Sequence, residues 1–253
     1  MQILIAVYFG YLAAMAVARR KARPAILSMA ILVCVFTVGT PHIMPLVYLL
    51  SGYWLPALLV RETNARLERQ LLDVDHMLFG AHGLEAFERR APRLLIEYLE
   101  LAYLLCYAVV PAGFASLLFA HYTGETLDTF WSVVLLAAFA CYGLLPWLPT
   151  RAPRAVEPPG HEMRSSIRRL NLAVLNRASV QWNTFPSGHT AASLATALAV
   201  GIHMPLAGVV LAVVALSIAA GSVVGRYHYA ADAIIGAAVA VLAFVMVAAA
   251  RGL

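Results

Sequence analysis

The chain alternates between long apolar runs and shorter polar segments, and the apolar runs set its architecture. A helix needs roughly 20 predominantly apolar residues to cross the hydrocarbon core of a bilayer. Eight runs approach or reach that length, which predicts an all-α fold, a polytopic membrane helix bundle of about eight spans. The runs cover residues 1–18, 24–41, 44–60, 94–120, 129–149, 187–203, 205–224 and 228–250.

The polar segments divide the chain further. Only residues 40–42 separate the second run from the third, so residues 1–43 are predicted to form an N-terminal helical hairpin and residues 44–253 the core. Between the third and fourth runs, residues 62–79 carry apolar side chains at helical spacing, which predicts an amphipathic helix at the membrane interface. Asp75 lies off this apolar stripe and is expected to be exposed.

Composition and charge place the chain in a membrane and orient it. Hydrophobic residues make up 62% and charged residues 12% of the chain, whereas about 25% charged residues is usual for a soluble domain. Eight spans put every lysine and arginine except Arg251 on one side. Basic loops face the cytoplasm, so a multi-pass cell membrane protein with both termini outside is predicted. Because this bias accounts for the net charge of +5, nucleic acid is not expected as a partner.

The first motif with chemical potential is Phe-Pro-Ser-Gly-His-Thr, residues 185–190, at the start of the sixth run. Ser187 is a good N-cap for the following helix, and Gly188 lets a ligand approach the backbone. Free N–H groups in the first turn of a helix bind anions such as phosphate. His189 stands in that turn and can donate a proton to a leaving oxygen. The alternative is a capped helix with an interfacial histidine.

The second motif is Arg-Tyr-His-Tyr-Ala-Ala-Asp, residues 226–232, at the start of the eighth run. His228 and Asp232 are four residues apart and share a helix face. Asp232 can hold one ring nitrogen of His228 and leave the other free to attack phosphorus, which gives a phosphohistidine. Arg226 offers a planar fork for phosphate oxygens. The alternative is a structural His–Asp pair at the helix end, although an aspartate inside a membrane helix favours function.

Together the two motifs resemble the type 2 phosphatidic acid phosphatase superfamily, which also includes the soluble vanadium haloperoxidases. The family's Pro-Ser-Gly-His signature is present intact as residues 186–189, and its His-x3-Asp signature as His228 to Asp232. The resemblance covers roughly residues 45–250 and implies a six-helix phosphatase-like core. It further implies that His228 is the nucleophile, Asp232 its partner and His189 the general acid, with no metal or other cofactor.

Two departures from the family pattern concern the arginines. The family's first signature, Lys-x6-Arg-Pro, is absent, and Thr-Arg-Ala-Pro-Arg, residues 150–154, stands in its place. Where the third signature usually has Ser-Arg, this chain has Gly221 and Ser222. This variant resembles the branch that contains inositol phosphorylceramide synthases, which transfer a phospho-headgroup to an alcohol. The predicted phosphate-binding residues are Arg151, Arg154, Ser187, Gly188 and Arg226.

Three further residues are candidate headgroup contacts. Glu100 and Tyr103 lie on a polar stripe near the start of the fourth run; the alternative is an interfacial helix end with packing tyrosines. Asn183 precedes the first motif, where it can cap the helix or touch substrate. It belongs to residues 150–186, an arginine-rich segment predicted to be the active-site loop.

These patterns predict a membrane-embedded lipid phosphate phosphatase that acts on a lipid phosphate or prenyl phosphate through a phosphohistidine. The close alternative is a lipid phosphotransferase of the inositol phosphorylceramide synthase type. An alternative of another class is a non-catalytic lipid-binding protein or transporter that kept the fold. The expected partners are the substrate and membrane lipids, and the active site is expected to face the cytoplasm.

Overall fold

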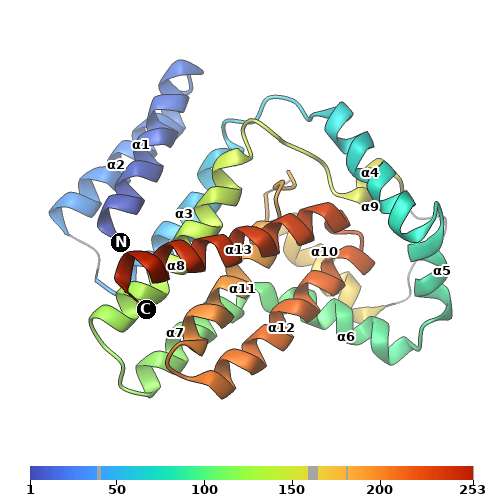
Figure 1. Ribbon diagram of the computed structural model, residues 1–253. Helices are drawn as coiled ribbons and strands as arrows, with labels where there is room; N and C mark the ends of the chain where they lie inside the picture. The colour runs from blue at the N-terminus through green and yellow to red at the C-terminus, as the bar shows by residue number, and fades with distance from the viewer. Residues whose placement is uncertain (39–40, 159–164, 181, 253) are drawn as a thin grey trace.

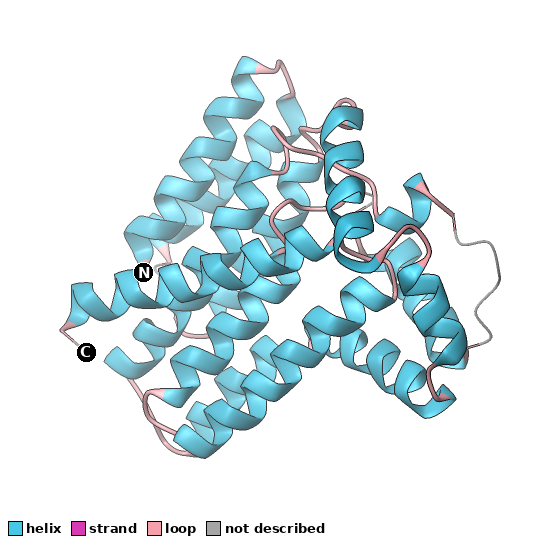
Figure 2. Cartoon of the chain, turned by 45° about the vertical axis from the view of Figure 1, so that its right-hand side comes forward, coloured by secondary structure: helices cyan, strands magenta, loops and turns pink. Residues whose placement is uncertain are grey.

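The computed structural model describes residues 1–38, 41–158, 165–180 and 182–252. Within these residues every regular element is a helix (Figure 2), and strand-like pairing is limited to one isolated bridge between Thr150 and Asn183. The predicted all-α class is confirmed. The helices are α1 (Gln2–Ala18), α2 (Ala22–Thr37), α3 (Met44–Ala57), α4 (Ala65–Phe79), α5 (Gly83–Arg90), α6 (Arg93–Leu104), the 3₁₀ helix η1 (Leu105–Tyr107), α7 (Val109–Phe119), α8 (Glu125–Leu144), α9 (Pro153–Val156), α10 (Ser166–Ala178), α11 (Gly188–Gly201), α12 (Pro205–Val224) and α13 (Ala230–Arg251).

Each of the eight apolar runs contains a helix, but the helices differ in length (Figure 1). By length and composition, the described residues hold three helices able to cross a membrane, α8, α12 and α13. The fourth run forms a bent pair of helical segments, in which the α6–η1 segment meets α7 at 64°. If the two segments together cross the membrane once, they make a fourth span. The other four have 14 to 17 residues. At about 1.5 Å per residue they fall short of a hydrocarbon core roughly 30 Å thick.

A proline explains the break in the fourth run. Pro111 lies in the first turn of α7. It has no N–H to donate to the carbonyl four residues earlier, and its ring crowds the preceding turn, so a continuous helix is interrupted there. The interruption leaves η1 packed against α11, beside the first motif.

Helix α11 lies inside the bundle, packed against α7, α8, α12 and α13 (Figure 1). Most of its side chains are Ala, Ser, Thr or Gly, and small side chains let helix backbones approach closely. A Cβ added to Gly208 of α12 would overlap the backbone of Gly201 in α11. This close packing holds the C-terminal end of α11 against the start of α12.

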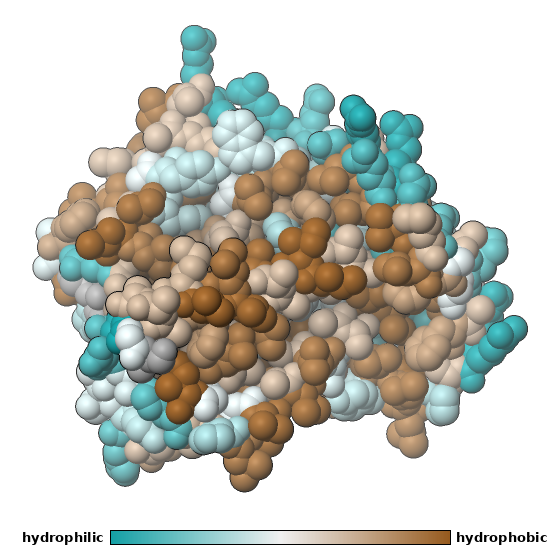
Figure 3. All heavy atoms as spheres, viewed as in Figure 1, coloured by the Kyte–Doolittle hydropathy of each residue, from teal (hydrophilic) through white to brown (hydrophobic). Residues whose placement is uncertain are grey.

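The outer faces of α12 and α13 are apolar and exposed. Figure 3 shows hydrophobic residues gathered across this side of the molecule, with polar residues mainly along its edges. Such a surface fits a membrane protein, because lipid rather than water covers it. The exposed residues include Leu206, Val209, Val213 and Leu216 on α12 and Ile234, Leu242, Val245 and Met246 on α13.

The loops after α1, α3 and α8 meet at one end of the bundle. Arg19 donates from Nη1 to the Leu59 carbonyl at 2.7 Å and from Nη2 to the Pro146 carbonyl at 3.0 Å. At the other end Arg251 pairs with Glu125 at 3.6 Å, and the two termini lie close together (Figure 1). The basic loop that contains Arg19 is therefore at the end opposite the termini.

The amphipathic segment expected near residues 62–79 corresponds to α4, whose N-cap Asn64 accepts the Leu67 N–H at 3.0 Å. The expectation that Asp75 is exposed was wrong: it is 5% exposed. Its Oδ1 accepts the Ala230 N–H at 2.8 Å. Asp75 is buried because α4 packs against the first turn of α13, where unpaired N–H groups and the helix dipole attract a carboxylate.

Candidate active site

His228 and Asp232 lie where α12 ends and α13 begins. His228 Nδ1 is 3.2 Å from Asp232 Oδ2, and both residues are buried. With its proton on Nδ1, His228 donates to the carboxylate and keeps Nε2 free for a ligand. Asp232 also accepts the Tyr229 N–H at 3.2 Å. The contact predicted from the four-residue spacing is present, but the predicted shared helix face was wrong. Helix α13 begins at Ala230, so His228 lies before the helix and is reached by the carboxylate that caps it.

His189 faces His228 from the first turn of α11. The centroids of the two imidazole rings are 5.8 Å apart and their planes meet at 81°. Three tyrosine rings surround His189 at 5.7 to 6.1 Å: those of Tyr53, Tyr103 and Tyr107. Histidines from two separate motifs thus meet at one site.

The start of α11 is occupied by internal contacts. Ser187 caps the helix with its side chain, as predicted, and its N–H donates to the Asp232 carbonyl at 3.0 Å. The Gly188 N–H donates to Thr184 Oγ1 at 3.2 Å, and the Tyr142 ring fills the space where a Cβ of Gly188 would project. The prediction that these N–H groups are free to bind phosphate therefore does not hold for Ser187 and Gly188. Their N–H groups join α11 to α13 and to the preceding loop.

A cavity of about 50 Å³ lies beside the two histidines. A cavity needs a volume of only roughly 10–15 Å³ to hold one water molecule. This cavity therefore has room for a group of several atoms, such as a phosphate. Of the lysines and arginines that the structure describes, only Arg154 lines it. Further lining residues that bear on the chemistry are Tyr53, Tyr103, Asn183, His189, Tyr227 and His228.

Arg154 is held by the backbone and by an aromatic ring. Its Nη1 and its backbone N–H donate to the Arg226 carbonyl at 3.4 and 3.3 Å, and its guanidinium lies 4.6 Å from the Tyr227 ring centroid. No carboxylate in the described part of the chain pairs with it, and burial lowers the pKa of this guanidinium. An arginine remains charged in proteins, so Arg154 offers an uncompensated positive charge to an anion in the cavity.

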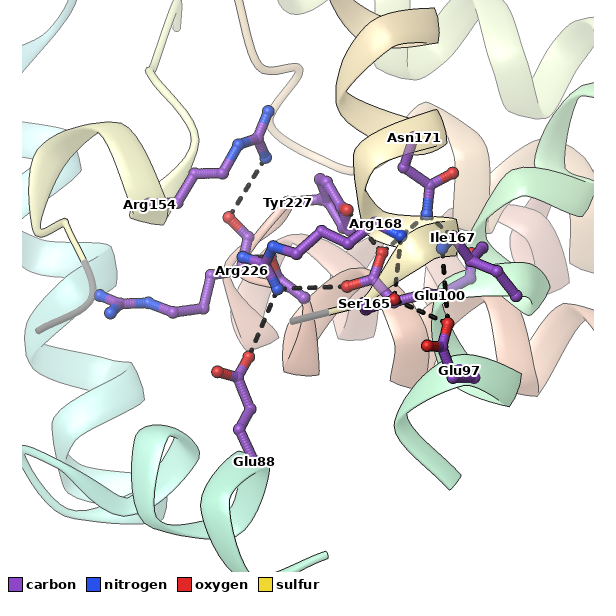
Figure 4. A network of polar contacts seen from close by, with 11 residues as sticks. Glu88, Glu97, Glu100, Arg154, Ser165, Ile167, Arg168, Asn171, Arg226 and Tyr227 are labelled. Atoms are coloured by element: carbon purple, nitrogen blue, oxygen red, sulfur yellow. Dashed lines mark hydrogen bonds and ion pairs between the residues drawn. The ribbon is translucent and has the colours of Figure 1, made fainter. Parts of the chain in front are cut away.

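A buried network supports Tyr227 next to this arginine (Figure 4). Glu100 accepts the Tyr227 hydroxyl at 2.6 Å, Asn171 Nδ2 at 2.7 Å and Arg168 Nη1 at 3.2 Å. Arg168 also pairs with Glu88 at 3.6 Å. Because its carboxylate already accepts from three side chains, Glu100 fixes the position of Tyr227 and therefore of the ring against which Arg154 lies.

Two of the arginines predicted to bind phosphate lie elsewhere. Arg151 pairs with Glu68 of α4 through two bonds, Nη2–Oε2 at 2.7 Å and Nε–Oε1 at 3.1 Å. Arg226 pairs with Glu157 at 2.9 Å and with Glu85 at 3.4 Å. Neither lines the cavity beside the histidines. Both arginines connect the loops to α4 and α5.

The three candidate headgroup contacts have different positions. Glu100 is 2% exposed, belongs to the buried network and does not line the cavity. Tyr103 lines the cavity and stacks on Tyr227 with ring centroids 4.1 Å apart. Asn183 lines it too, and its Nδ2 donates to Asp232 Oδ2 at 2.9 Å. The predicted active-site loop that contains Asn183 includes residues 159–164 and 181, which lie outside the described residues.

A comparison with protein families matches residues 69–246 to the PAP2 superfamily. The matched region covers more than half of the chain and contains both histidine motifs. The chain belongs to the PAP2 superfamily. No curated protein and no solved structure gives a match. Membership confirms the resemblance to the type 2 phosphatidic acid phosphatases and supports a phosphatase or phosphotransferase that acts on lipid phosphates; the inositol phosphorylceramide synthase-like branch stays a prediction.

An apolar cavity of about 400 Å³ adjoins the polar cavity of this PAP2 protein. Tyr53 and His189 line both cavities. The apolar one lies among α3, α7, α8 and α11, and its lining includes Leu46, Leu50 and Val110. Its volume is within the roughly 300–1,000 Å³ typical of small-molecule sites. A polar space with two histidines and an arginine thus meets a space suited to hydrocarbon.

Two carboxyl groups near the site, both outside the membrane helices, have shifted pKa values. Burial raises the pKa of Asp75 to about 6, although the Ala230 N–H opposes the shift. Burial raises the pKa of Glu88 to about 7, against the lowering effect of Arg168. Near neutral pH the Glu88 carboxyl therefore exchanges between charged and neutral forms beside Arg168.

Three residues of this PAP2 site had no role predicted from the sequence: Arg168, Tyr227 and Tyr53. A signal existed for Arg168, because it and Asn171 are three residues apart on α10 and share a helix face. Tyr53 comes from α3, far away in the chain, and no local pattern marks it. Among the described residues, no group of three His, Cys, Asp or Glu side chains is arranged to hold a metal ion.

Proposed function

We propose that this PAP2 protein is a membrane-embedded lipid phosphate phosphatase that works through a phosphohistidine intermediate and needs no metal. The observation that carries the proposal is the facing pair of His189 and His228, 5.8 Å apart between ring centroids. Asp232 holds the far nitrogen of His228, and Arg154, which pairs with no carboxylate among the described residues, lines the same cavity. A nucleophile, a proton donor and a phosphate-binding cation are thus together.

The proposed reaction has two steps. His228 Nε2 attacks phosphorus, the bond from phosphorus to the lipid oxygen breaks, and His189 gives that oxygen a proton. Water then attacks the phosphohistidine, His189 takes its proton, and inorganic phosphate leaves with the histidine restored. Arg154 contributes by neutralising the charge that builds on the phosphate oxygens, since positioning and electrostatics supply most of the catalysis in phosphoryl transfer.

The apolar cavity supports a lipid as the substrate. It shares two lining residues with the polar cavity, Tyr53 and His189. A substrate that places its phosphate beside Arg154 can therefore place part of a hydrocarbon chain among Leu46, Leu50 and Val110. A lipid phosphate or a prenyl phosphate meets this requirement, because each joins a long apolar chain to a phosphate.

The nucleophile is tested with purified protein and a lipid labelled in its phosphate. Wild-type protein is expected to release phosphate and to form an acid-labile phosphoenzyme, with undiminished activity in a chelator. His228→Ala is expected to abolish both phosphate release and the phosphoenzyme. Full activity in His228→Ala would exclude the proposed nucleophile. Absence of any turnover by the wild type, with lipid still bound, would favour the non-catalytic alternative.

The general acid is tested through the leaving group. His189→Ala is expected to slow hydrolysis of a lipid phosphate strongly, because an alkoxide needs a proton to leave. In the first turnover, before water attacks, the same variant is expected to release nitrophenolate from p-nitrophenyl phosphate with a much smaller loss in rate, because nitrophenolate leaves without a proton. Equal losses on both substrates would contradict this assignment.

The phosphotransferase alternative differs only in the acceptor that reaches the phosphohistidine. In the assay with labelled lipid phosphate, release of free phosphate in water alone indicates hydrolysis. Product that forms only when a second lipid alcohol is added indicates transfer. We place the active site on the cytoplasmic face, since the basic loops carry the positive-inside bias.

A further inference from the structure

Three N–H donors converge on one oxygen of Asp232. Its Oδ2 accepts from Asn183 Nδ2 at 2.9 Å, from His228 Nδ1 at 3.2 Å and from the Tyr229 backbone at 3.2 Å. Asp232 is fully buried, and its Oδ1 has no hydrogen-bond partner within the described residues. The hydrogen bonds to Oδ2 therefore determine the orientation of the Asp232 carboxylate.

Asn183 differs from the other two donors in its origin. His228 and Tyr229 belong to the same short segment as Asp232, so their contacts move with that segment. Asn183 approaches from the loop before α11. Among the described residues it is the only side chain outside residues 228–232 that donates to this carboxylate. A carboxylate held from two directions cannot rotate freely, whereas one held by its own segment can.

The backbone of Asn183 is itself anchored. Its N–H donates to the Thr150 carbonyl at 2.6 Å, and the Thr150 N–H donates back at 3.4 Å. Thr150 is fully buried, and Arg154 follows four residues later. The bridge therefore fixes Asn183 and the start of the loop that carries Arg154 with the same pair of hydrogen bonds.

We propose that Asn183 is a positioning residue that acts through Asp232 to aim Nε2 of His228 at the phosphorus. Its amide fixes the rotation of the carboxylate, the carboxylate fixes the imidazole, and the imidazole presents its free nitrogen to the cavity. The proposal rests on the proposed function, because it assigns Asn183 a part in the attack by His228. It is an alternative to the prediction that Asn183 contacts a headgroup, and the experiment below separates the two.

The test compares Asn183→Ala and Asn183→Asp with the wild type on a labelled lipid phosphate. Asn183→Ala removes the donor; Asn183→Asp keeps the size of the side chain but sets a second carboxylate against Asp232. Both are expected to lower kcat with little change in KM, because the interaction acts on the attack and not on substrate binding. The expected loss in kcat for Asn183→Ala is roughly 10- to 100-fold, by analogy with the loss seen when a partner that orients a metal-bound histidine is removed.

The pH profile separates positioning from a structural role. In Asn183→Asp the acid limb of the kcat profile is expected to move to higher pH, because two adjacent carboxylates resist ionising together. The other titratable groups that face Asp232 are His228, Tyr229 and Asp75, and they are unchanged in both variants. Asn64→Ala is the matched control: it removes an asparagine N-cap from α4 and is expected to leave kcat and the pH profile as in the wild type.

Each outcome decides the proposal. A kcat and pH profile equal to the wild type in both folded variants would overturn it, and so would a raised KM with unchanged kcat, which indicates a substrate contact. Melting curves establish folding, and the isosteric Asn183→Asp serves if Asn183→Ala does not fold. Failure of the proposed function is seen separately, as absence of wild-type turnover or as full activity in His228→Ala.

Discussion

At the residue scale, the charge available to a phosphate depends on which arginine has no carboxylate partner in the part of the chain that the structure describes. Arg151, Arg154 and Arg226 all lie close to the cavity in sequence or in space. Two of them are neutralised by glutamates of α4, α5 and the loop. Arg154 instead lies against the Tyr227 ring and a backbone carbonyl. A charge-assisted bond to phosphate is strong only where no competing anion already holds the guanidinium, which singles out Arg154.

Replacing Arg154 is therefore expected to impair turnover far more than replacing Arg151. Arg154→Ala is expected to lower kcat/KM for a lipid phosphate by roughly 100-fold or more, the loss typical of removing one donor to a developing oxyanion. Arg151→Ala removes a half-exposed guanidinium that pairs with the buried Glu68 outside the cavity, and it is expected to have a small effect on kcat/KM. Steady-state kinetics check both. Equal losses would mean that Arg151 reaches the phosphate after all.

At the element scale, the site is a junction between the starts of α11 and α13. The Ser187 N–H donates to the Asp232 carbonyl, and a Cβ on Gly236 would overlap the Ser187 backbone. The Tyr142 ring of α8 closes over Gly188. The distance between the two histidines is therefore set by helix packing around α11, and the glycines at these contacts keep the helices close enough.

Gly188→Ala is expected to destabilise the protein by about 1–3 kcal/mol, because the added methyl group overlaps the Tyr142 ring and overpacking carries a cost of that size. The measurement is thermal unfolding of the purified protein in detergent. Gly10→Ala in α1 is the matched control, since nothing lies within 4 Å of its added Cβ. A melting temperature that falls equally in both variants would refute the packing argument.

The buried network in which Arg168 of α10 pairs with Glu88 of α5 and Glu100 of α6 gives a prediction about the pH dependence of stability. Burial raises the pKa of Glu88 from 4.5 to about 7 in the folded protein. Between these pH values the folded state holds a proton that the unfolded chain has released, so stability falls as pH rises from about 4.5 to 7. Glu88→Gln removes this proton exchange and is expected to show a smaller fall in melting temperature between pH 5 and pH 8. The exposed Glu62→Gln is the control; a wild-type response in Glu88→Gln would contradict the assignment.

At the scale of the whole molecule, the chain has an apolar surface and two chemically distinct ends. Apolar side chains cover the outer faces of α12 and α13 (Figure 3). The end with Arg19 collects basic loops, and the end with the termini holds the Arg251–Glu125 pair. The start of α13 carries His228 away from the termini, so the membrane orientation of the basic end is also that of the site.

Cysteine labelling tests this orientation. Ala155 is exposed on α9, and Ala155→Cys adds a thiol next to Arg154. If the site faces the cytoplasm, a membrane-impermeant maleimide is expected to label this variant in lysed cells but not in intact cells. The native Cys106 and Cys141 are buried and Cys34 is half-buried, so the unmodified chain supplies the background. Labelling in intact cells would reverse the assigned orientation.

The sequence by itself determined the features that depend on local spacing. The apolar runs give helices, and the four-residue spacing of His228 and Asp232 predicts their contact, although α13 begins only at Ala230 and His228 lies before it. Ser187 was recognisable as a cap for the same reason, since a cap acts within a single turn. The class of fold, the His–Asp contact and the family followed from such patterns.

Only the tertiary structure decided which distant groups share the site. Asp75 is buried because α13 begins beside α4, and the N–H groups of Ser187 and Gly188 are occupied because α11 starts against α13 and its preceding loop. Arg154 is available because Glu68, Glu85 and Glu157 lie near the other arginines. Contacts of this kind join segments far apart in the chain, and helix packing sets them, so neither residue type nor spacing records them.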